Sequence, residues 1–501
     1  MLSRYLKRNW TSLPYYVLHR SYNKVQSDVS SASALLDSYR IDKEKSLNRS
    51  YDIQISPNRI FANKEVNLDE IKVYGFDYDY TIASYKKKLQ YLIFDMALDY
   101  LIEDNKYPKE MKSFAYDPGF GVRGLHYDIE KGLLMKIDSQ HHVELGTVYR
   151  GYTPLDDSEV LATYGGTHLS VQYLSSIYDN GKYMRQLIDV DSLSEMALLT
   201  QIAEYFKQKS MSYDPKYIFM DVKAAIKKVH LSGKMHATVK NAIGDYLEPD
   251  PDLKELLEYL TSAKKKIFII TNSQFDFLNA GMTHLIGPDW RSMFDIIITS
   301  ARKPSFYTDA FHHFRHLMTS DYTTSWDRVK CFKKGEVYQR GSAREFLNLA
   351  GFKGSEVLYF GDQVYRDLAD LALKLGWKTG AVIPELEREI EIISSDHYQR
   401  ALNWLISLEK LIDRAQSIRS PEALQLLHEW KEEYQEVRKL LKMSFNPRFG
   451  SMFRTSSKAT YFSGRIARYA DLYTSSITNF LTYQLHHTFY QKRSALPHEF
   501  I

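Results

Sequence analysis

The stretch Val73-Tyr74-Gly75-Phe76-Asp77-Tyr78-Asp79-Tyr80-Thr81 decides the fold, because a short apolar run passes directly into a pair of acids. Such a run is typical of a strand buried on both faces of a sheet. On a strand, Asp77 and Asp79 would point the same way, and at its carboxyl end both could converge on one site. Two close carboxylates are unfavourable unless a cation or a shared proton lies between them. The pair indicates a metal site, a proton relay or both, although two solvated acids at a strand end would give the same letters.

Three further apolar runs end in polar residues, as the first one does. They are Ile267–Ile270 before Thr271-Asn272-Ser273, Asp295–Thr299 before Ala301-Arg302-Lys303-Pro304, and Val357–Phe360 before Gly361-Asp362, with Asp367 beyond. Short apolar strands that alternate with helical stretches predict an α/β fold with a parallel, Rossmann-like sheet core. Ligands of open α/β sheets bind outside the carboxyl ends of the strands, so we expect the four clusters to meet there. Together they supply acids for a metal and for chemistry, donors for phosphate oxygens and a lysine for negative charge.

Composition excludes several classes of protein. The 501 residues carry 66 Lys and Arg against 62 Asp and Glu, a formal net charge of +4, which argues against a basic nucleic-acid coat and against an acidic disordered tail. Hydrophobic residues make up 44% of the chain, so a large core is available. No apolar run approaches the roughly 18 residues that a membrane-spanning helix needs, so we expect no such helix. The single cysteine, Cys331, excludes an internal disulfide and a thiolate metal cluster.

The amino-terminal segment has the character of a targeting sequence. Its first acid is Asp28, and it is basic, rich in hydroxyl side chains and amphipathic. These features predict a mitochondrial presequence over residues 1–27 and location in the mitochondrial matrix. The alternative is a basic leader without an address on a cytoplasmic protein. A polar stretch over residues 28–57 reads as a linker.

The remaining chain divides by the spacing of the four clusters. Roughly 190 residues separate Asp77 from Thr271, far too many for a loop, so they should form an inserted cap. We therefore expect a core of residues 58–87 and 263–385, with the cap over 88–262. From 386 to 501 we expect a helical segment that packs on the core, because apolar residues recur at intervals of three and four up to Met443. Pro421 interrupts that pattern.

The order of the four clusters resembles the motifs of the haloacid-dehalogenase (HAD) superfamily. More narrowly, the chain resembles the cytosolic purine 5'-nucleotidase family, in its branch of 5'-nucleotidase domain-containing proteins, from about Asn58 to Glu499. The shared stretches are Ile60–Asn63, Tyr116–Pro118, Arg123–Leu125, Gly376-Trp377, Val382–Leu386, Phe449–Arg454, Arg468–Tyr473 and Leu496–Glu499. The resemblance implies a HAD-like core, a homo-oligomer and a phosphoric monoester hydrolase.

Roles for the site residues follow from the resemblance. Asp77 would be the nucleophile that takes the phosphoryl group, and Asp79 the general acid and then the base for water. The Asp77 and Asp362 carboxylates and the backbone carbonyl of Asp79 would hold Mg²⁺, with Asp367 as a further ligand or as a group that orients metal-bound waters. Two groups complete the site. Thr271 and Asn272 would bind the phosphoryl oxygens, and Lys303 would neutralise their charge.

The cap helix departs from the family pattern. Purine-specific members have an arginine, then an aspartate, then a His-Tyr pair along this helix, where this chain has Lys223, Lys227 and His230, followed by Leu231. The acid that would meet the edge of a purine is thus replaced by lysine. These three residues are the expected substrate contacts of the cap, although a solvated lysine face and a structural histidine would read the same way. The reaction class therefore transfers better than the substrate preference does.

Three functions fit the sequence. The first is a Mg²⁺-dependent 5'-nucleotidase-type phosphatase that hydrolyses a nucleoside monophosphate or a related small phosphate ester. The second, suggested by the altered cap helix, is a nucleotide or metabolite sensor, or an interaction protein, that keeps the fold with little turnover. The third is a phosphoprotein phosphatase, which the large cap disfavours. Scattered lysine runs without interleaved aromatics give no reason to expect nucleic-acid binding.

Overall fold

The computed structural model describes residues 30–48, 55–174, 183–309, 311–416 and 420–493, so the expected presequence at 1–27 lies outside the described residues. The chain forms two compact units. Of the described residues, those within 30–48 and 396–440 form one unit, and those within 55–395 and 441–493 form the other. Each unit is considered by itself below, and the larger one contains all four sequence clusters.

A ten-stranded sheet is the backbone of the larger unit. Its strand order is β1-β16-β15-β14-β3-β9-β10-β13-β11-β12. The strands are β1 (Phe61–Ala62), β3 (Val73–Phe76), β9 (Lys266–Ile270), β10 (Ile296–Thr299), β11 (Phe314–Met318), β12 (Thr323–Thr324), β13 (Val337–Arg340), β14 (Val357–Gly361), β15 (Lys378–Val382) and β16 (Leu472–Thr474). All pairs from β16 to β13 are parallel, whereas β1, β11 and β12 pair antiparallel at the two edges. The predicted α/β core with a parallel sheet is confirmed.

The strand register brings the four polar clusters together at the carboxyl ends of the parallel strands. Phe76 of β3 lies opposite Phe360 of β14 and Ile269 of β9, and Ile298 of β10 lies opposite Ile270. Every residue of β3, β10 and β14 is buried, which explains their continuous apolar sequences. The polar residues that follow these strands therefore emerge side by side.

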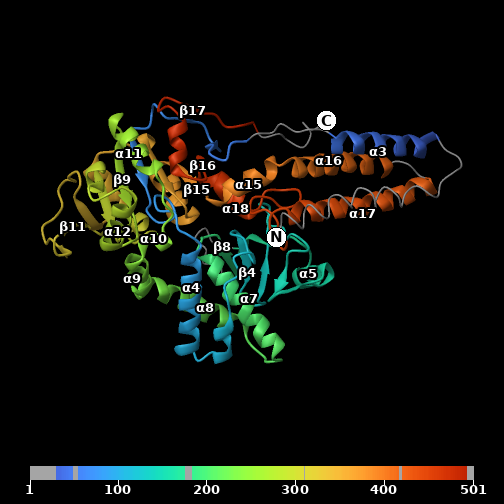
Figure 1. Cartoon of the computed structure of the whole chain (residues 1–501), viewed down its shortest axis with the longest axis horizontal. Helices are drawn as coiled ribbons and strands as arrows, with labels where there is room; N and C mark the ends of the chain where they lie inside the picture. Colours follow the sequence, from blue (N-terminus) through green and yellow to red (C-terminus); the bar gives the residue numbers. More distant parts are fainter. Residues whose placement is uncertain (1–29, 49–54, 175–182, 310, 417–419, 494–501) are drawn as a thin grey trace. The chain divides into compact units, whose positions relative to one another are not determined.

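The chain between β3 and β9 forms a second layer of structure. Its five-stranded antiparallel sheet has the order β7-β6-β5-β4-β8. The strands are β4 (Leu125–Asp128), β5 (Leu133–Met135), β6 (Tyr149–Arg150), β7 (Thr153–Pro154) and β8 (Met184–Leu187), and the helices are α4 (Lys88–Glu103), α5 (Asp157–Tyr164), α6 (Val171–Leu174), α7 (Ser192–Gln208), α8 (Pro215–Leu231), α9 (Lys234–Asn241), α10 (Ile243–Tyr246) and α11 (Asp252–Ser262). Figure 1 shows α4, α7 and α8 beside β4 and β8.

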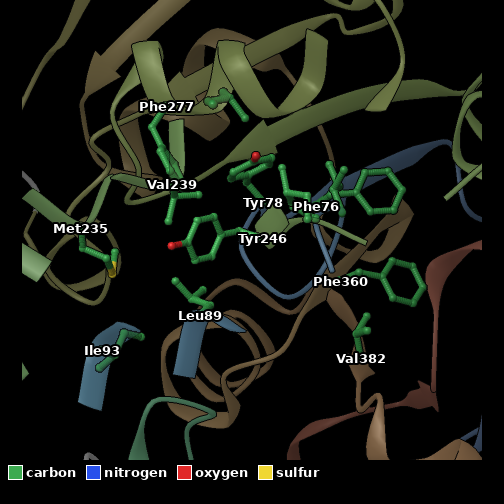
Figure 2. Packing of buried hydrophobic residues seen from close by; sticks show 14 of the residues in the cluster. Phe76, Tyr78, Leu89, Ile93, Met235, Val239, Tyr246, Phe277, Phe360 and Val382 are labelled. Atoms are coloured by element: carbon green, nitrogen blue, oxygen red, sulfur yellow. The ribbon is translucent and has the colours of Figure 1, made fainter. Parts of the chain in front are cut away.

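One apolar cluster joins this insert to the core. Figure 2 shows Tyr246 and Val239 of the insert packed with Tyr78 and Phe277 of the core. Gly281 permits the close approach of Tyr78, since a Cβ at Gly281 would lie 1.7 Å from the Tyr78 hydroxyl oxygen. The contacts group insert and core in one compact unit, so the expected cap boundaries at 88 and 262 stay a prediction.

Further helices follow the insert along the chain. They are α12 (Phe275–Leu285), α13 (Ser305–Thr308), α14 (Ala343–Ala350), α15 (Glu385–Ser394), α16 (Asp396–Gln416), α17 (Pro421–Met443) and α18 (Tyr461–Tyr469), with the π-helical segments η4 (Val364–Ala369) and η5 (Leu371–Leu375) after β14. None of the helices in the described ranges combines the length and the apolar character that crossing a membrane requires.

Two expectations about the ends of the chain were wrong. The stretch expected to be a linker contains helix α3 (Ser30–Asn48), which packs on α16 in the smaller unit. Leu35 and Tyr39, one turn apart, supply its apolar contacts, and the polar residues around them hide that short pattern in the sequence. The segment 386–501 is also not purely helical. Its β16 joins the main sheet, and β17 (Thr488–Phe489) pairs with β2 (Val66–Asn67).

Candidate active site

Asp77 directly follows the last residue of β3, where the chain leaves the sheet. Its backbone N–H still donates to the Phe360 carbonyl (2.9 Å), after which the chain turns through Tyr78. The carboxylate is held from two sides, because the Tyr78 N–H donates to Oδ1 (2.8 Å) and Lys303 Nζ lies 2.9 Å from Oδ2. The side chain is buried and lines a cavity of about 830 Å³.

Lys303 joins two of the acids. Its Nζ lies between Asp77 Oδ2 (2.9 Å) and Asp367 Oδ1 (2.5 Å), and only 2% of the lysine side chain is exposed. Burial lowers the pKa of Lys303, but the Asp367 and Asp77 carboxylates outweigh it and the net shift is upward. Lys303 is therefore a permanent cation at the end of β10.

Asp77, Asp362 and Asp367 form a group that could hold a metal ion. One carboxylate oxygen from each lies within 4.8 Å of the others, and all three residues are buried. Asp362 Oδ2 is buried and has no hydrogen-bond partner within the described part of the chain. A buried carboxylate oxygen without a partner is costly, so a cation there would stabilise it. Three carboxylates are the hard oxygen ligands that suit Mg²⁺, and the residues fit that ion.

Burial dominates the protonation of these acids. It raises the pKa of Asp77, against the opposing effect of Lys303, and raises the pKa of Asp362 well above its ordinary value, with Asp367 and Asp77 adding to the shift. Burial also raises the pKa of Asp367 to about 6, although Lys303 pulls it down. The cluster carries more negative charge than one lysine compensates.

Asp79 lines the same cavity and accepts hydrogen bonds from two hydroxyl groups. The Tyr85 hydroxyl donates to Oδ1 and the Ser273 hydroxyl donates to Oδ2, both at 2.6 Å. Burial raises the pKa of Asp79, and these two hydrogen bonds only partly oppose the shift. Asp79 is therefore an acid that can keep a proton, whereas Asp77 faces a lysine.

Thr271 and Asn272 follow β9, but they do not occupy equivalent places. Asn272 lines the cavity. Its side-chain amide also holds the loop that carries Lys303. Asn272 Nδ2 donates to the Lys303 carbonyl (3.1 Å), and the Lys303 N–H donates to Asn272 Oδ1 (2.6 Å). Thr271 is fully buried, and its hydroxyl accepts the Ser273 N–H (3.1 Å). The predicted phosphate contacts of both side chains stay a prediction.

Backbone geometry after β14 places the last two acids. Asp362 follows β14 directly, and Asp367 lies in the π-helical segment η4, a widened turn that is common at functional sites. Gly361 is required here, because a Cβ at this position would lie 2.3 Å from the Asp367 Cβ. A larger residue would therefore push Asp367 away from Lys303.

The insert supplies the opposite wall of the cavity. Lys223, Lys227 and His230 of α8 line it together with Arg185, Glu195 and Asp191. The three predicted cap residues thus face the same cavity as Asp77 and Asp79. Lys223 and Lys227 are exposed, whereas His230 is partly buried with its Nε2 3.4 Å from Asp191 Oδ2.

Sequence reasoning missed several residues around the site. Ser273 and Tyr85 hold Asp79 but belong to no spaced acid motif. The buried Arg123 and the partly exposed Glu385 form an ion pair at 2.6 and 2.7 Å that ties the insert to the start of α15. Both pair members fall within stretches shared with the family, and only their distance in the fold reveals their contact.

Comparison with known proteins agrees with these features. The family model of the 5' nucleotidase family matches residues 60–501. The human 5'-nucleotidase domain-containing protein 2 is 45% identical over 446 residues, covering 89% of this chain and 86% of the human protein. A 5'-nucleotidase domain-containing protein of Dictyostelium discoideum is 37% identical, covering 98% of this chain and 82% of its own.

A solved structure described as a predicted phosphoglycolate phosphatase from Haemophilus somnus aligns with 62% of this chain and 85% of its own, at 14% identity and a TM-score of 0.26. The extent of the family match and the identity to its members confirm the resemblance found in the sequence. The chain belongs to the 5' nucleotidase family.

Proposed function

We propose that the chain is a Mg²⁺-dependent phosphatase that hydrolyses a nucleoside monophosphate or a related small phosphate ester through an aspartyl-phosphate. The reaction class, hydrolysis of a phosphoric monoester, follows from family membership. The observation that carries the mechanism is the convergence of Asp77, Lys303, Asp362 and Asp367 at the carboxyl ends of the parallel strands, with Asp79 lining the same cavity.

Asp77 supplies the nucleophile. A carboxylate oxygen of Asp77 forms a bond to phosphorus while the bond from phosphorus to the ester oxygen breaks. The hydrogen bond from the Tyr78 N–H and the contact with Lys303 fix the direction of that carboxylate. Lys303 also stabilises the negative charge that gathers on the transferring group.

Asp79 moves the protons. Its raised pKa suits an acid that protonates the leaving alkoxide, and the resulting carboxylate then takes a proton from the attacking water. Water attacks phosphorus, the bond from Asp77 to phosphorus breaks, and phosphate leaves. Ser273 and Tyr85 hold Asp79 in place through both steps.

Asp77 and Asp362 would hold the metal ion with the Asp79 carbonyl, and Asp367 would ligate it or orient its waters. A bound Mg²⁺ would neutralise charge on the phosphoryl oxygens and on the three acids. The cavity of about 830 Å³ has room for a nucleotide-sized ester, because small-molecule sites commonly enclose about 300–1,000 Å³.

A second function rests on the lysines of α8. If Lys223 and Lys227 bind a ligand that Asp77 does not turn over, the chain would act as a nucleotide or metabolite sensor, or as an interaction protein. Tight ligand binding without Mg²⁺-dependent phosphate release would favour this alternative.

The test is phosphate release from a panel of nucleoside, deoxynucleoside and sugar monophosphates, each with Mg²⁺ and with EDTA. Wild type is compared with Asp77→Asn, whose near-equal size should preserve the fold. We expect release that requires both Mg²⁺ and Asp77. Phosphate release that persists in EDTA or in Asp77→Asn would contradict the mechanism. If no compound of the panel releases phosphate, the sensor function would be favoured.

Location and assembly are separate proposals. The basic leader supports import into the mitochondrial matrix, with a cytoplasmic protein as the alternative. A fluorescent fusion of residues 1–40 should enter mitochondria, and a diffuse cytosolic signal would refute the leader. Family resemblance supports a homo-oligomer, which sedimentation of the full chain would test.

A further inference from the structure

Two lysines on the insert side of the cavity lack a carboxylate partner among the residues that the structure describes. Lys223 and Lys227 lie one turn apart on α8 and both line the cavity. The next residue, Lys228, points away from it and pairs with Asp104 at 2.5 Å. One helix thus carries a paired lysine on its outer face and two unpaired lysines on its cavity face.

The acids near α8 that line the cavity already have partners other than Lys223 and Lys227. Glu195 pairs with Arg185 at 3.3 Å, and Asp191 lies 3.4 Å from His230. Across the mouth of the cavity, Asp276 pairs with Lys240 at 2.8 Å. These three pairs share no residue, so each of the acids has a partner other than Lys223 or Lys227.

Asp189 also lines the cavity, but its interactions are with residues outside α8. Its charge interacts with the buried Arg123 and with Asp362. It therefore offers no partner to α8, and positive charge is left in excess at Lys223 and Lys227.

Besides this excess of positive charge, like charges lie close to one another around Lys223. Burial lowers the pKa of Lys223, the Arg185 guanidinium adds to the shift, and Lys227 adds further, with Glu195 opposing them. An anion bound between the two lysines would relieve this repulsion. Ammonium groups have three donors and no acceptor, so they match phosphate or carboxylate oxygens better than the mixed donor and acceptor edge of a purine.

We propose that the preferred substrate carries a second anionic group, a phosphate or a carboxylate, which Lys223 and Lys227 bind while the scissile phosphate lies at Asp77. The inference rests on the proposed phosphatase function and names its substrate class. It makes the lysines of α8 specificity-determining residues, since they touch a part of the substrate that does not react.

Matched substrate pairs test the proposal. Adenosine 5'-monophosphate is compared with adenosine 3',5'-bisphosphate, and glycerol 3-phosphate with 3-phosphoglycerate, so that one pair adds a phosphate and the other a carboxylate. For wild type we expect kcat/KM to favour the anionic member of at least one pair by roughly ten- to a hundredfold. The pair that shows the preference identifies the anion.

Variants locate the preference. In Lys223→Gln/Lys227→Gln the ratio of kcat/KM between the two members should fall at least tenfold, and high salt should lower the wild-type ratio. The matched control is Lys228→Gln, which removes a lysine from the outer face of the same helix and should keep the ratio. Equal kcat/KM within both pairs, or a ratio unchanged in the double variant, would overturn the proposal.

Calorimetry in EDTA separates this inference from the proposed function. Wild type and the double variant are titrated with the same four compounds, so that binding is measured without turnover. One outcome is that no phosphate is released while wild type still binds the anionic members more tightly than the double variant does. That outcome would defeat the phosphatase mechanism but leave the second-anion site standing. Equal binding of both members by wild type would defeat the second-anion site, whatever the activity.

Discussion

Lys303 is the residue on which the arrangement of the acids depends most. It contacts Asp77 and Asp367 at once and is almost fully buried. Removing one partner of a buried ion pair costs about 3–5 kcal/mol, because the remaining charge is left uncompensated. Here two carboxylates would be left without their cation.

We therefore expect Lys303→Met to reduce kcat by roughly 10²- to 10³-fold, the usual effect of losing a group that stabilises transition-state charge. The free energy of unfolding should fall as well. Phosphate-release rates and urea unfolding measure the two effects. Lys72→Met, which breaks an exposed pair with Glu356, is the control and should leave both nearly unchanged. Retained activity in Lys303→Met would show that the lysine is not part of the chemistry.

Glu389 lies away from the site and gives the molecule a pH-dependent stability. Burial raises its pKa from 4.5 to about 7, although Ser451, Lys136 and Arg454 oppose the shift. The native state holds this proton more tightly than the unfolded state does. The free energy of unfolding must therefore fall as pH rises from about 4.5 to about 7.

Glu389→Gln should remove this contribution, since glutamine keeps the size of the side chain but does not titrate. Unfolding by urea at pH 5 and pH 8 measures the change. Between the two pH values, wild type should lose about 1–3 kcal/mol more than the variant. Parallel pH profiles for the two proteins would exclude this role for Glu389.

Much of the site could be predicted from single residues. Asp77, Asp79, Lys303, Asp362 and Asp367 follow three apolar strands, β3, β10 and β14, and the rule for the carboxyl ends of parallel strands brings them together. The partners of Asp79 could not be predicted in that way. Tyr85 reaches it through a local turn, and the Ser273 hydroxyl reaches it from the loop after β9, 194 positions along the chain.

At the scale of the element, the turn from β14 into η4 sets the spacing of Asp362 and Asp367. Gly361 leaves no room for a side chain, because a Cβ would lie 2.3 Å from the Asp367 Cβ and 2.7 Å from its Cγ. Any larger residue must move the segment that carries Asp367.

Gly361→Ala should consequently lower kcat at least tenfold and destabilise the protein by about 1–3 kcal/mol, the range of overpacked sites. Gly244→Ala is the control, since the nearest atom to its added Cβ would lie 3.6 Å away. Thermal unfolding and steady-state rates distinguish the two variants. If Gly361→Ala matched wild type in both, the turn would be more tolerant than the packing indicates.

The strands of the core were predictable and some elements at the ends of the chain were not. Strands β9, β10 and β14 are short, fully apolar except at their ends, and bounded by polar residues. Strand β16 has only three residues and depends on β15 for its place in the sheet. Helix α3 depends on contacts with α16, so tertiary packing rather than local pattern specifies both elements.

At the scale of the whole molecule, the smaller unit has a core of its own. Trp404, Trp430 and Leu35 are buried in it, and Tyr39 stacks on Trp430 at 5.3 Å. Glu433 accepts hydrogen bonds from Tyr39, Lys43 and Trp404 at 2.6–3.0 Å. A separate core predicts that damage to this unit stays within it.

Trp430→Ala should destabilise residues 30–48 and 396–440 by about 3–5 kcal/mol through loss of buried contacts. Hydrogen exchange followed by mass spectrometry should then show faster exchange in those segments, with unchanged protection in β3 and β14. Trp326→Ala, at a side chain 89% exposed, serves as the control. Faster exchange at β3 in Trp430→Ala would contradict the independence of the two units.

If Asp77 is the nucleophile, it carries the phosphoryl group during turnover, and that group can be trapped on it. Wild type and Asp77→Asn are mixed with Mg²⁺ and a substrate from the panel, quenched in acid during turnover, and digested for mass spectrometry. We expect a phosphoryl group on the wild-type peptide that contains Asp77, and none on the variant. Turnover without a modified peptide, undiminished in Asp77→Asn, would contradict this role of Asp77.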